Sequence, residues 1–115
     1  MAAALAAGVF AATVAFAEDD APPSGNAEAG RKLYVATGCA ECHGLAAQGS
    51  TSSGPRLAPA PLEFEAFLAQ MRKPSNEMPP YEAAILSDQQ VADIYAYLRG
   101  VAKGRDAKDI PLLNN

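Results

Sequence analysis

Both cysteines and the only histidine of this 115-residue chain lie in one pentapeptide, Cys39-Ala40-Glu41-Cys42-His43. Two thiols at this spacing project from one turn of the backbone, and the imidazole follows directly after the second thiol. No other part of the chain concentrates so much reactive and metal-ligating chemistry. The pentapeptide therefore predicts a single site, built from consecutive residues, around which a small domain folds.

The C-x-x-C-H spacing is the one that attaches c-type haem. Each thiol can form a thioether with one vinyl group of a single porphyrin, and the imidazole can then ligate the iron. Covalent attachment prevents loss of the haem from a domain too small to bury it fully. We therefore predict one haem c, attached through Cys39 and Cys42, with His43 on the iron.

The N-terminal residues are typical of a secretory signal. Residues 2–17 carry no charge, and they end in the small-x-small tripeptide Ala15-Phe16-Ala17. The run is shorter than the roughly 20 residues of a membrane span. We expect a cleaved signal at 1–17, a linker at 18–25, the domain at 26–103 and a tail at 104–115. No Lys or Arg opens the segment, as a signal normally would, and an uncleaved N-terminal helical anchor is the alternative.

Three other uses of the cysteine pair compete with haem. A thioredoxin-like redox pair belongs to a βαβ context, and no segment here has the period of a strand. A structural zinc site takes four protein ligands, whereas the motif supplies Cys39, Cys42 and His43. A plain disulfide remains open, because an exported chain meets oxidising conditions.

Three short helices are predicted. The first is capped by Asn26 and stops at Gly38, and the second runs roughly from Leu62 to Arg72. The last begins after Ser87, which opens a capping box, and ends at Gly100 or Gly104. The segments between these helices are rich in Gly, Ser and Pro and are longer than ordinary connections, which favours loops that wrap a ligand.

The second axial ligand of the iron must be another soft side chain, because His43 is the only histidine. Met71 falls on the apolar face of the second helix, where methionine most often packs in a core. Met78 lies in a proline-rich loop that cannot be helical before Pro79. Its thioether is free of helical constraint, so we favour Met78. A thioether opposite an imidazole raises the reduction potential relative to two imidazoles.

Several segments together resemble the small monohaem class I cytochrome c family. They are the first helix with Gly30 and Tyr34, the C-A-E-C-H motif, Gly54-Pro55-Arg56-Leu57, Met78-Pro79-Pro80-Tyr81 and the helix within 86–98. The similarity covers residues 26–102, and its specific elements are C-x-x-C-H and M-P-x-Y. The resemblance implies an all-α cytochrome c fold, with three main short helices and long loops wrapped around one covalent haem.

The resemblance also implies contacts within the domain. The first helix would cross the last near Ile94, Tyr95 and Leu98, and the Pro55 carbonyl would accept a hydrogen bond from the His43 ring. The tyrosine hydroxyls would reach either haem propionates or backbone groups, and Arg56 is either a propionate partner or a solvated loop residue. The residues expected around the haem are Cys39, Cys42, His43, Pro55, Leu57, Leu68, Met71, Met78 and Tyr81.

The function implied is that of a periplasmic one-electron carrier, not an enzyme. Its partners would be a redox protein donor and acceptor, such as a dehydrogenase, oxidase or reductase, and the free carrier would be a monomer. The net charge of −4 does not suggest nucleic acid as a partner, and membrane contact would require retention of the N-terminal segment. The alternative is a tightly associated cytochrome subunit of a periplasmic dehydrogenase or terminal oxidase. A haem peroxidase or gas sensor would need Met78 to dissociate and a distal acid–base group.

Overall fold

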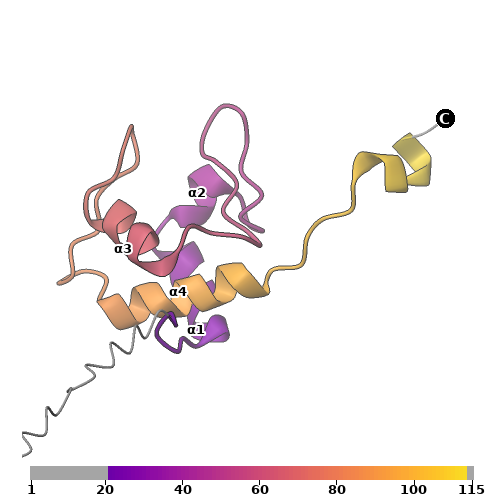
Figure 1. The fold of residues 1–115 in the computed structure, drawn as a ribbon. Coiled ribbons are helices and arrows are strands. Elements are labelled where there is room, and N and C mark those ends of the chain that lie inside the picture. Colours follow the sequence, from indigo (N-terminus) through magenta and orange to yellow (C-terminus); the bar gives the residue numbers. More distant parts are fainter. Residues whose placement is uncertain (1–20, 114–115) are drawn as a thin grey trace, which may run out of the picture.

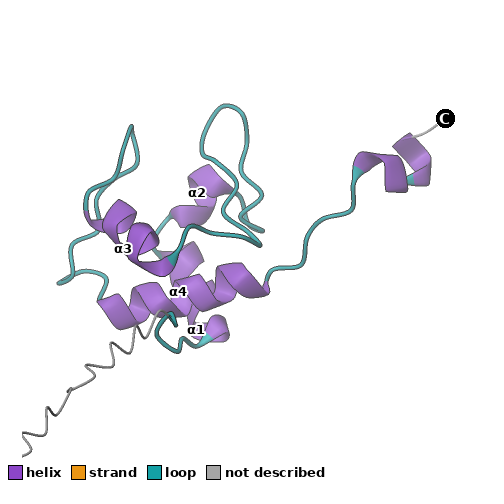
Figure 2. Cartoon of the chain, in the orientation of Figure 1, coloured by secondary structure: helices purple, strands orange, loops and turns teal. Residues whose placement is uncertain are grey.

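The structure is a computed structural model that describes residues 21–113 (Figure 1). The predicted signal at 1–17 and the first residues of the linker lie outside this range. Four α-helices follow one another along the chain: α1 (Ala27–Ala36), α2 (Cys39–His43), α3 (Phe64–Arg72) and α4 (Asp88–Gly100). Two 3₁₀ turns, η1 (Ala107–Asp109) and η2 (Pro111–Leu113), end the described part. Residues 21–113 contain no strand (Figure 2), which confirms the all-helical class.

The helix ends follow the capping signals in the sequence. The Asn26 side chain accepts the Ala29 N–H at the start of α1, and Gly38 leaves the helix with a φ of +84°. Ser87 and Gln90 form both bonds of the predicted capping box at the start of α4. The second predicted helix begins at Phe64, two residues after the predicted start at Leu62. Leu62 is exposed, and the buried apolar face of the helix starts at Phe64.

The crossing of α1 over α4 forms the centre of the domain. A Cβ atom on Gly30 would lie 1.9 Å from the Asp93 carbonyl oxygen, so only glycine permits this approach of the two backbones. One turn later, Tyr34 is fully buried, with its ring 5.4 Å from that of Tyr97. The predicted contact of the first helix with the region of Ile94 in the last is therefore present.

Helix α3 packs on the other side of α4 through aromatic contacts. Phe64 and Phe67 each place a ring centroid 5.3 Å from that of Tyr95. Met71 is the third buried residue of this helix face. Together with Leu86, Val91, Ile94 and Leu98 from the last helix region, these side chains make up much of one hydrophobic core.

The loop from Gly44 to Glu63 folds back on α2 through its own hydrogen bonds. The Gly49 N–H donates to the His43 carbonyl at 2.7 Å, and the Leu57 N–H donates to the Ala47 carbonyl at 2.9 Å. Ala47 is fully buried, so this loop contributes to the core. The predicted wrapping loop thus has a defined path, next to the pentapeptide.

The C-terminal tail leaves the domain after α4 (Figure 1). Leu112 and Leu113 are 83% and 64% exposed, and the tail does not fold back over the helices. Within residues 21–113 no helix is long and apolar enough to cross a membrane.

The α1–α4 crossing generates a first prediction. Gly30→Ala forces the two backbones apart, and we expect it to lower the free energy of unfolding of the holo-protein by about 1–3 kcal/mol or more. Gly100→Ala is the matched control, because a Cβ atom there meets nothing within 4 Å, and we expect no loss. Denaturant unfolding measures both, and equal stability of the two variants would contradict the packing described.

Candidate haem site

The pentapeptide forms the one-turn helix α2, which lies between two glycines with φ of +84°. Those glycines let the chain turn sharply before Cys39 and after His43, so the three functional side chains leave a single turn. Cys39 is half-buried, Cys42 is exposed, and both thiols are free. The His43 side chain, by contrast, is buried at 8% exposure.

The imidazole of His43 is held by the backbone of the following loop. Its Nδ1 atom lies 2.8 Å from the Pro55 carbonyl oxygen, which can only accept a hydrogen bond. In this contact Nδ1 is therefore the donor, and in the neutral ring Nε2 carries the free lone pair. This is the contact that the resemblance implied for Pro55, and it leaves Nε2 as the nitrogen able to ligate iron.

Two neighbours of Pro55 let the loop pass this close to the ring. A Cβ atom on Gly54 would lie 3.0 Å from His43 Nδ1, so a larger residue would push the ring or the loop away. The Ser53 hydroxyl donates to the Cys42 carbonyl at 2.7 Å. The loop is thus attached to the last residues of α2 at two successive points.

Met78 lies in the loop between α3 and α4, and its side chain is half-buried. The Gln70 side chain donates its Nε2 N–H to the Met78 sulfur at 3.8 Å, a weak contact that leaves sulfur lone pairs for a metal. Met71, the other candidate, is only 3% exposed and belongs to the core. Met71 therefore packs in the core, as its position in the sequence predicted. Its contact with haem stays a prediction.

Tyr81 connects the Met78 loop to the start of the pentapeptide. Its hydroxyl donates to the Thr37 carbonyl at 2.8 Å, and the Thr37 hydroxyl lies 3.4 Å from the Cys39 sulfur. Burial raises the pKa of the Cys39 thiol, which keeps that sulfur protonated near neutral pH. Burial is also the main reason why the pKa of the Tyr81 phenol is raised, so it remains a donor.

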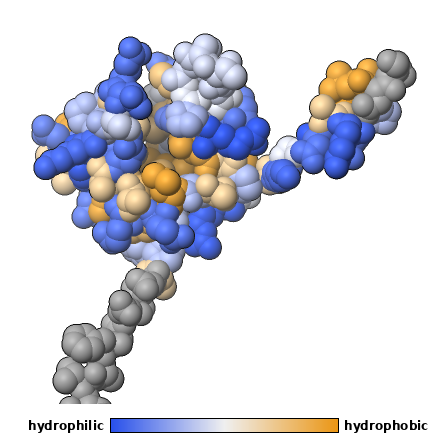
Figure 3. All heavy atoms as spheres, turned by 45° about the horizontal axis from the view of Figure 1, so that its top comes forward, coloured by the Kyte–Doolittle hydropathy of each residue, from blue (hydrophilic) through white to orange (hydrophobic). Residues whose placement is uncertain are grey.

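Several partly buried apolar side chains pack against the hydrophobic core. Among them are Leu57, Leu68, Met78 and Tyr81, all expected in the pocket, together with Leu33 and Ala40. Figure 3 shows apolar atoms gathered between the two long loops, inside a hydrophilic rim. Two free thiols on one turn, a lone pair on His43 Nε2 and these apolar side chains fit a covalently attached haem.

Two of the tyrosine hydroxyls reach backbone groups in this structure. The hydroxyls of Tyr81 and Tyr97 donate to backbone carbonyls, that of Tyr97 to Leu45 at 3.0 Å. Tyr95 uses its ring for packing against α3, and Arg56 is exposed. Sequence reasoning missed a further bond, from the Tyr34 hydroxyl to the Gly44 carbonyl at 2.8 Å, which fixes the end of α2.

Comparison with known proteins agrees with this geometry. Residues 25–98 match the family described as "Cytochrome C oxidase, cbb3-type, subunit III". The chain belongs to this family of c-type cytochromes. Over 77 residues the cytochrome is 34% identical to cytochrome c-555 of Methylococcus capsulatus (strain ATCC 33009 / NCIMB 11132 / Bath). That match covers 65% of this chain and 62% of its relative, so the cytochrome spans less than two thirds of that protein. No solved structure matches the cytochrome.

The buried phenol of Tyr34 generates a prediction on alkaline stability. Burial raises its pKa in the folded domain, whereas an unfolded tyrosine ionises near pH ~10. The unfolded state therefore releases the proton first, and the stability present below pH ~10 falls as the pH rises towards the folded pKa. We expect Tyr34→Phe to cost about 1 kcal/mol at pH ~7 but to flatten the alkaline decline.

Thermal unfolding of the reduced holo-protein between pH ~7 and ~11 measures this effect. The wild-type protein at neutral pH, where Tyr34 does not titrate, is the reference. An alkaline decline of the same steepness in the Tyr34→Phe variant would contradict the assignment.

Proposed function

We propose that this cytochrome is an exported one-electron carrier whose haem iron is held by His43 and Met78. The observation that supports the proposal best is the contact between His43 Nδ1 and the Pro55 carbonyl at 2.8 Å. In the neutral imidazole this bond leaves Nε2 as the nitrogen that can ligate iron, and it increases the electron donation of the ring. Haem bound to these residues would supply the one-electron couple. The side chains would then only bind and orient it.

The residues around the site are suited to holding one geometry through both oxidation states. His43 is fixed by Pro55, and the turn that follows it is fixed by Tyr34. Tyr81 ties the Met78 loop to the residues before Cys39. Because the acceptors are backbone carbonyls, which do not titrate, the same bonds can form in both oxidation states. A site of this kind needs little rearrangement during electron transfer.

The same residues favour a carrier over an enzyme. With His43 and Met78 both on the iron, no coordination position is left for a substrate. The chain has no second histidine to act as a distal acid–base group. Rapid binding of carbon monoxide to the reduced wild-type protein would favour a gas sensor or peroxidase instead.

The proposed location is the periplasm, and the proposed partners are redox proteins. The apolar residues 2–17, ending in Ala15-Phe16-Ala17, support export, and cofactor attachment through thioethers suits an exported protein. Docking between redox partners is expected to be transient, over less than about 1,200 Å² of buried surface.

We expect the purified holo-protein to begin at Glu18, because cleavage of the predicted signal follows Ala17. N-terminal sequencing checks this, and a retained Met1 would instead support an anchor.

A permanent subunit of an oxidase or dehydrogenase is the second candidate. The family's printed name, a subunit of a cbb3-type oxidase, and the exposed Leu112 and Leu113 in the tail favour it. Mild extraction from native membranes separates the two candidates, because a subunit stays with its complex whereas a carrier is recovered alone.

Replacement of Met78 tests the proposed ligand pair. We expect Met78→Ala to remove the sulfur-to-iron charge-transfer band of the oxidised protein and to lower the reduction potential by on the order of 100 mV, since loss of the thioether favours oxidised iron. Visible spectroscopy and redox titration measure these changes, and a pyridine haemochrome assay confirms that haem is still attached.

Met71→Leu is the matched control, because it keeps an apolar side chain in the core and removes the other candidate sulfur. We expect it to retain the band and the potential. If Met71→Leu loses the band while Met78→Ala keeps it, the ligand assignment is wrong.

A further inference from the structure

Three consecutive residues at the end of α3 all bond to the loop that carries Met78. The Gln70 side chain pairs with Ser75, through Ser75 N–H to Oε1 at 3.4 Å and Nε2 to Oγ at 3.3 Å. The Met71 carbonyl accepts the Tyr81 N–H at 2.8 Å. Arg72 donates from Nη1 to the Tyr81 carbonyl at 2.7 Å. The loop is therefore held on both sides of Met78 by one helical turn.

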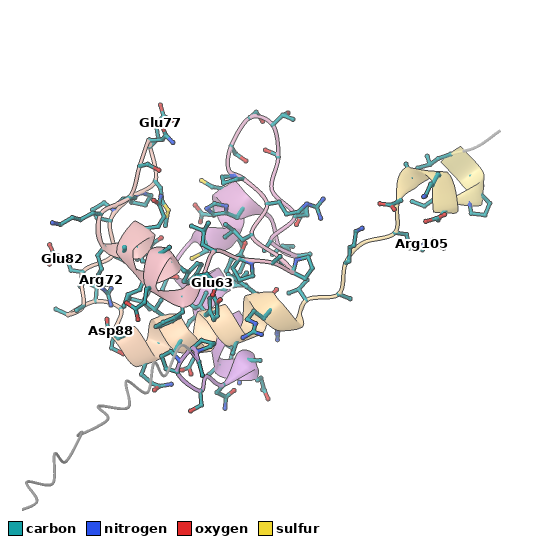
Figure 4. The ribbon with its side chains drawn as sticks, viewed as in Figure 1. Glu63, Arg72, Glu77, Glu82, Asp88 and Arg105 are labelled. Carbon is teal, nitrogen blue, oxygen red and sulfur yellow. The ribbon has the colours of Figure 1, made fainter. Side chains whose placement is uncertain are left out.

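Two of these side chains also make contacts beyond the loop backbone. Gln70 Nε2 reaches the Met78 sulfur itself, at 3.8 Å. Arg72 forms an ion pair with Asp88, the first residue of α4, and Figure 4 shows the two side chains together between α3 and α4. The Arg72 side chain is only 21% exposed, whereas that of Asp88 is 68% exposed. Arg72 thus joins the end of α3, the Met78 loop and the start of α4.

We propose that Gln70 and Arg72 are positioning residues for Met78, and that they set how readily its sulfur yields to an outside ligand of the iron. The proposal rests on the ligand pair proposed above. Residues 73–80 are mostly exposed, so the loop has few packing contacts of its own. Its conformational freedom would otherwise oppose keeping the sulfur in one place. Bonds at Ser75 and Tyr81 shorten the free segment on either side of Met78.

Arg72 and Gln70 hold the Met78 loop in different ways. The Arg72 guanidinium is a fork that can hold the Tyr81 carbonyl and the Asp88 carboxylate at once, and both bonds are charge-assisted. Gln70 acts on the sulfur side of the loop, where its N–H occupies one face of the thioether. Because α3 is anchored in the core through Phe64, Phe67 and Met71, the turn that carries these residues is a fixed support.

Exchange of Met78 for imidazole in the oxidised holo-protein tests the proposal. Imidazole is neutral, so a change of surface charge has little direct effect on its binding. We expect Arg72→Met to bind imidazole about tenfold more tightly than wild type, and Gln70→Leu about threefold, as read from loss of the sulfur-to-iron band. Arg72→Lys keeps the charge without the fork, and its affinity should lie between wild type and Arg72→Met.

Two control variants separate positioning from general stability. Ile94→Val removes a methyl group from the core at the α1–α4 crossing, and we expect it to lower the stability of the domain. Glu82→Gln removes one charge from the same loop without breaking a bond found in the structure (Figure 4). We expect both to bind imidazole as wild type does.

The proposal is overturned if Arg72→Met and Gln70→Leu bind imidazole like wild type, or if Ile94→Val tightens binding as much as they do. If Arg72→Met fails to fold, Arg72→Lys and Gln70→Leu decide the question under the same criteria. Absence of the band in the wild-type protein would overturn the ligand pair as well, which distinguishes that failure from one confined to Gln70 and Arg72.

Discussion

The hydrogen bond between His43 and the Pro55 carbonyl determines how the rest of the domain can be arranged. It joins a side chain of α2 to a loop twelve residues further along the chain, at 2.8 Å. The loop passes so close to the ring that a Cβ atom at position 54 would lie 3.0 Å from His43 Nδ1, and it is bonded back to the Cys42 and His43 carbonyls. The bond also assigns the protons of the imidazole, because a carbonyl can only accept. Fold and metal chemistry therefore depend on the same contact.

The two sides of the site are built differently. Cys39, Cys42 and His43 come from a single turn, so their relative positions are set by local backbone geometry. Met78 comes from a loop whose position depends on bonds to α3, on Tyr81 and, through Arg72, on α4. Side chains on one turn have fixed relative positions once that turn forms. The position of a side chain on a loop depends instead on the hydrogen bonds that hold the loop. Under the proposed ligation, the Met78 side is where ligand exchange and the reduction potential can be adjusted without disturbing attachment.

Sequence patterns predicted the parts of the molecule that local chemistry controls. The pentapeptide, the Asn26 cap and the Ser87–Gln90 capping box each depend on a few neighbouring residues. The bonds from Tyr34 to Gly44 and from Arg72 to Tyr81 were not predicted, because each depends on how two distant elements meet. An arginine side chain at the end of a helix can adopt many solvated conformations. Nothing in the neighbouring sequence indicates that Arg72 bonds to the loop. The late start of α3 has a similar cause, since the exposure of Leu62 follows from tertiary packing.

The central claim is that His43 and Met78 close the two faces of one covalent haem, and the most direct measurement is the nuclear magnetic resonance spectrum of the reduced holo-protein with ¹³C-labelled methionine methyl groups. A methyl group next to a porphyrin face is strongly shielded by the ring current. The account predicts one methyl resonance shifted far upfield, present in the Met71→Leu variant and absent from Met78→Ala. A spectrum without such a resonance, or with one that disappears in Met71→Leu, would contradict the account.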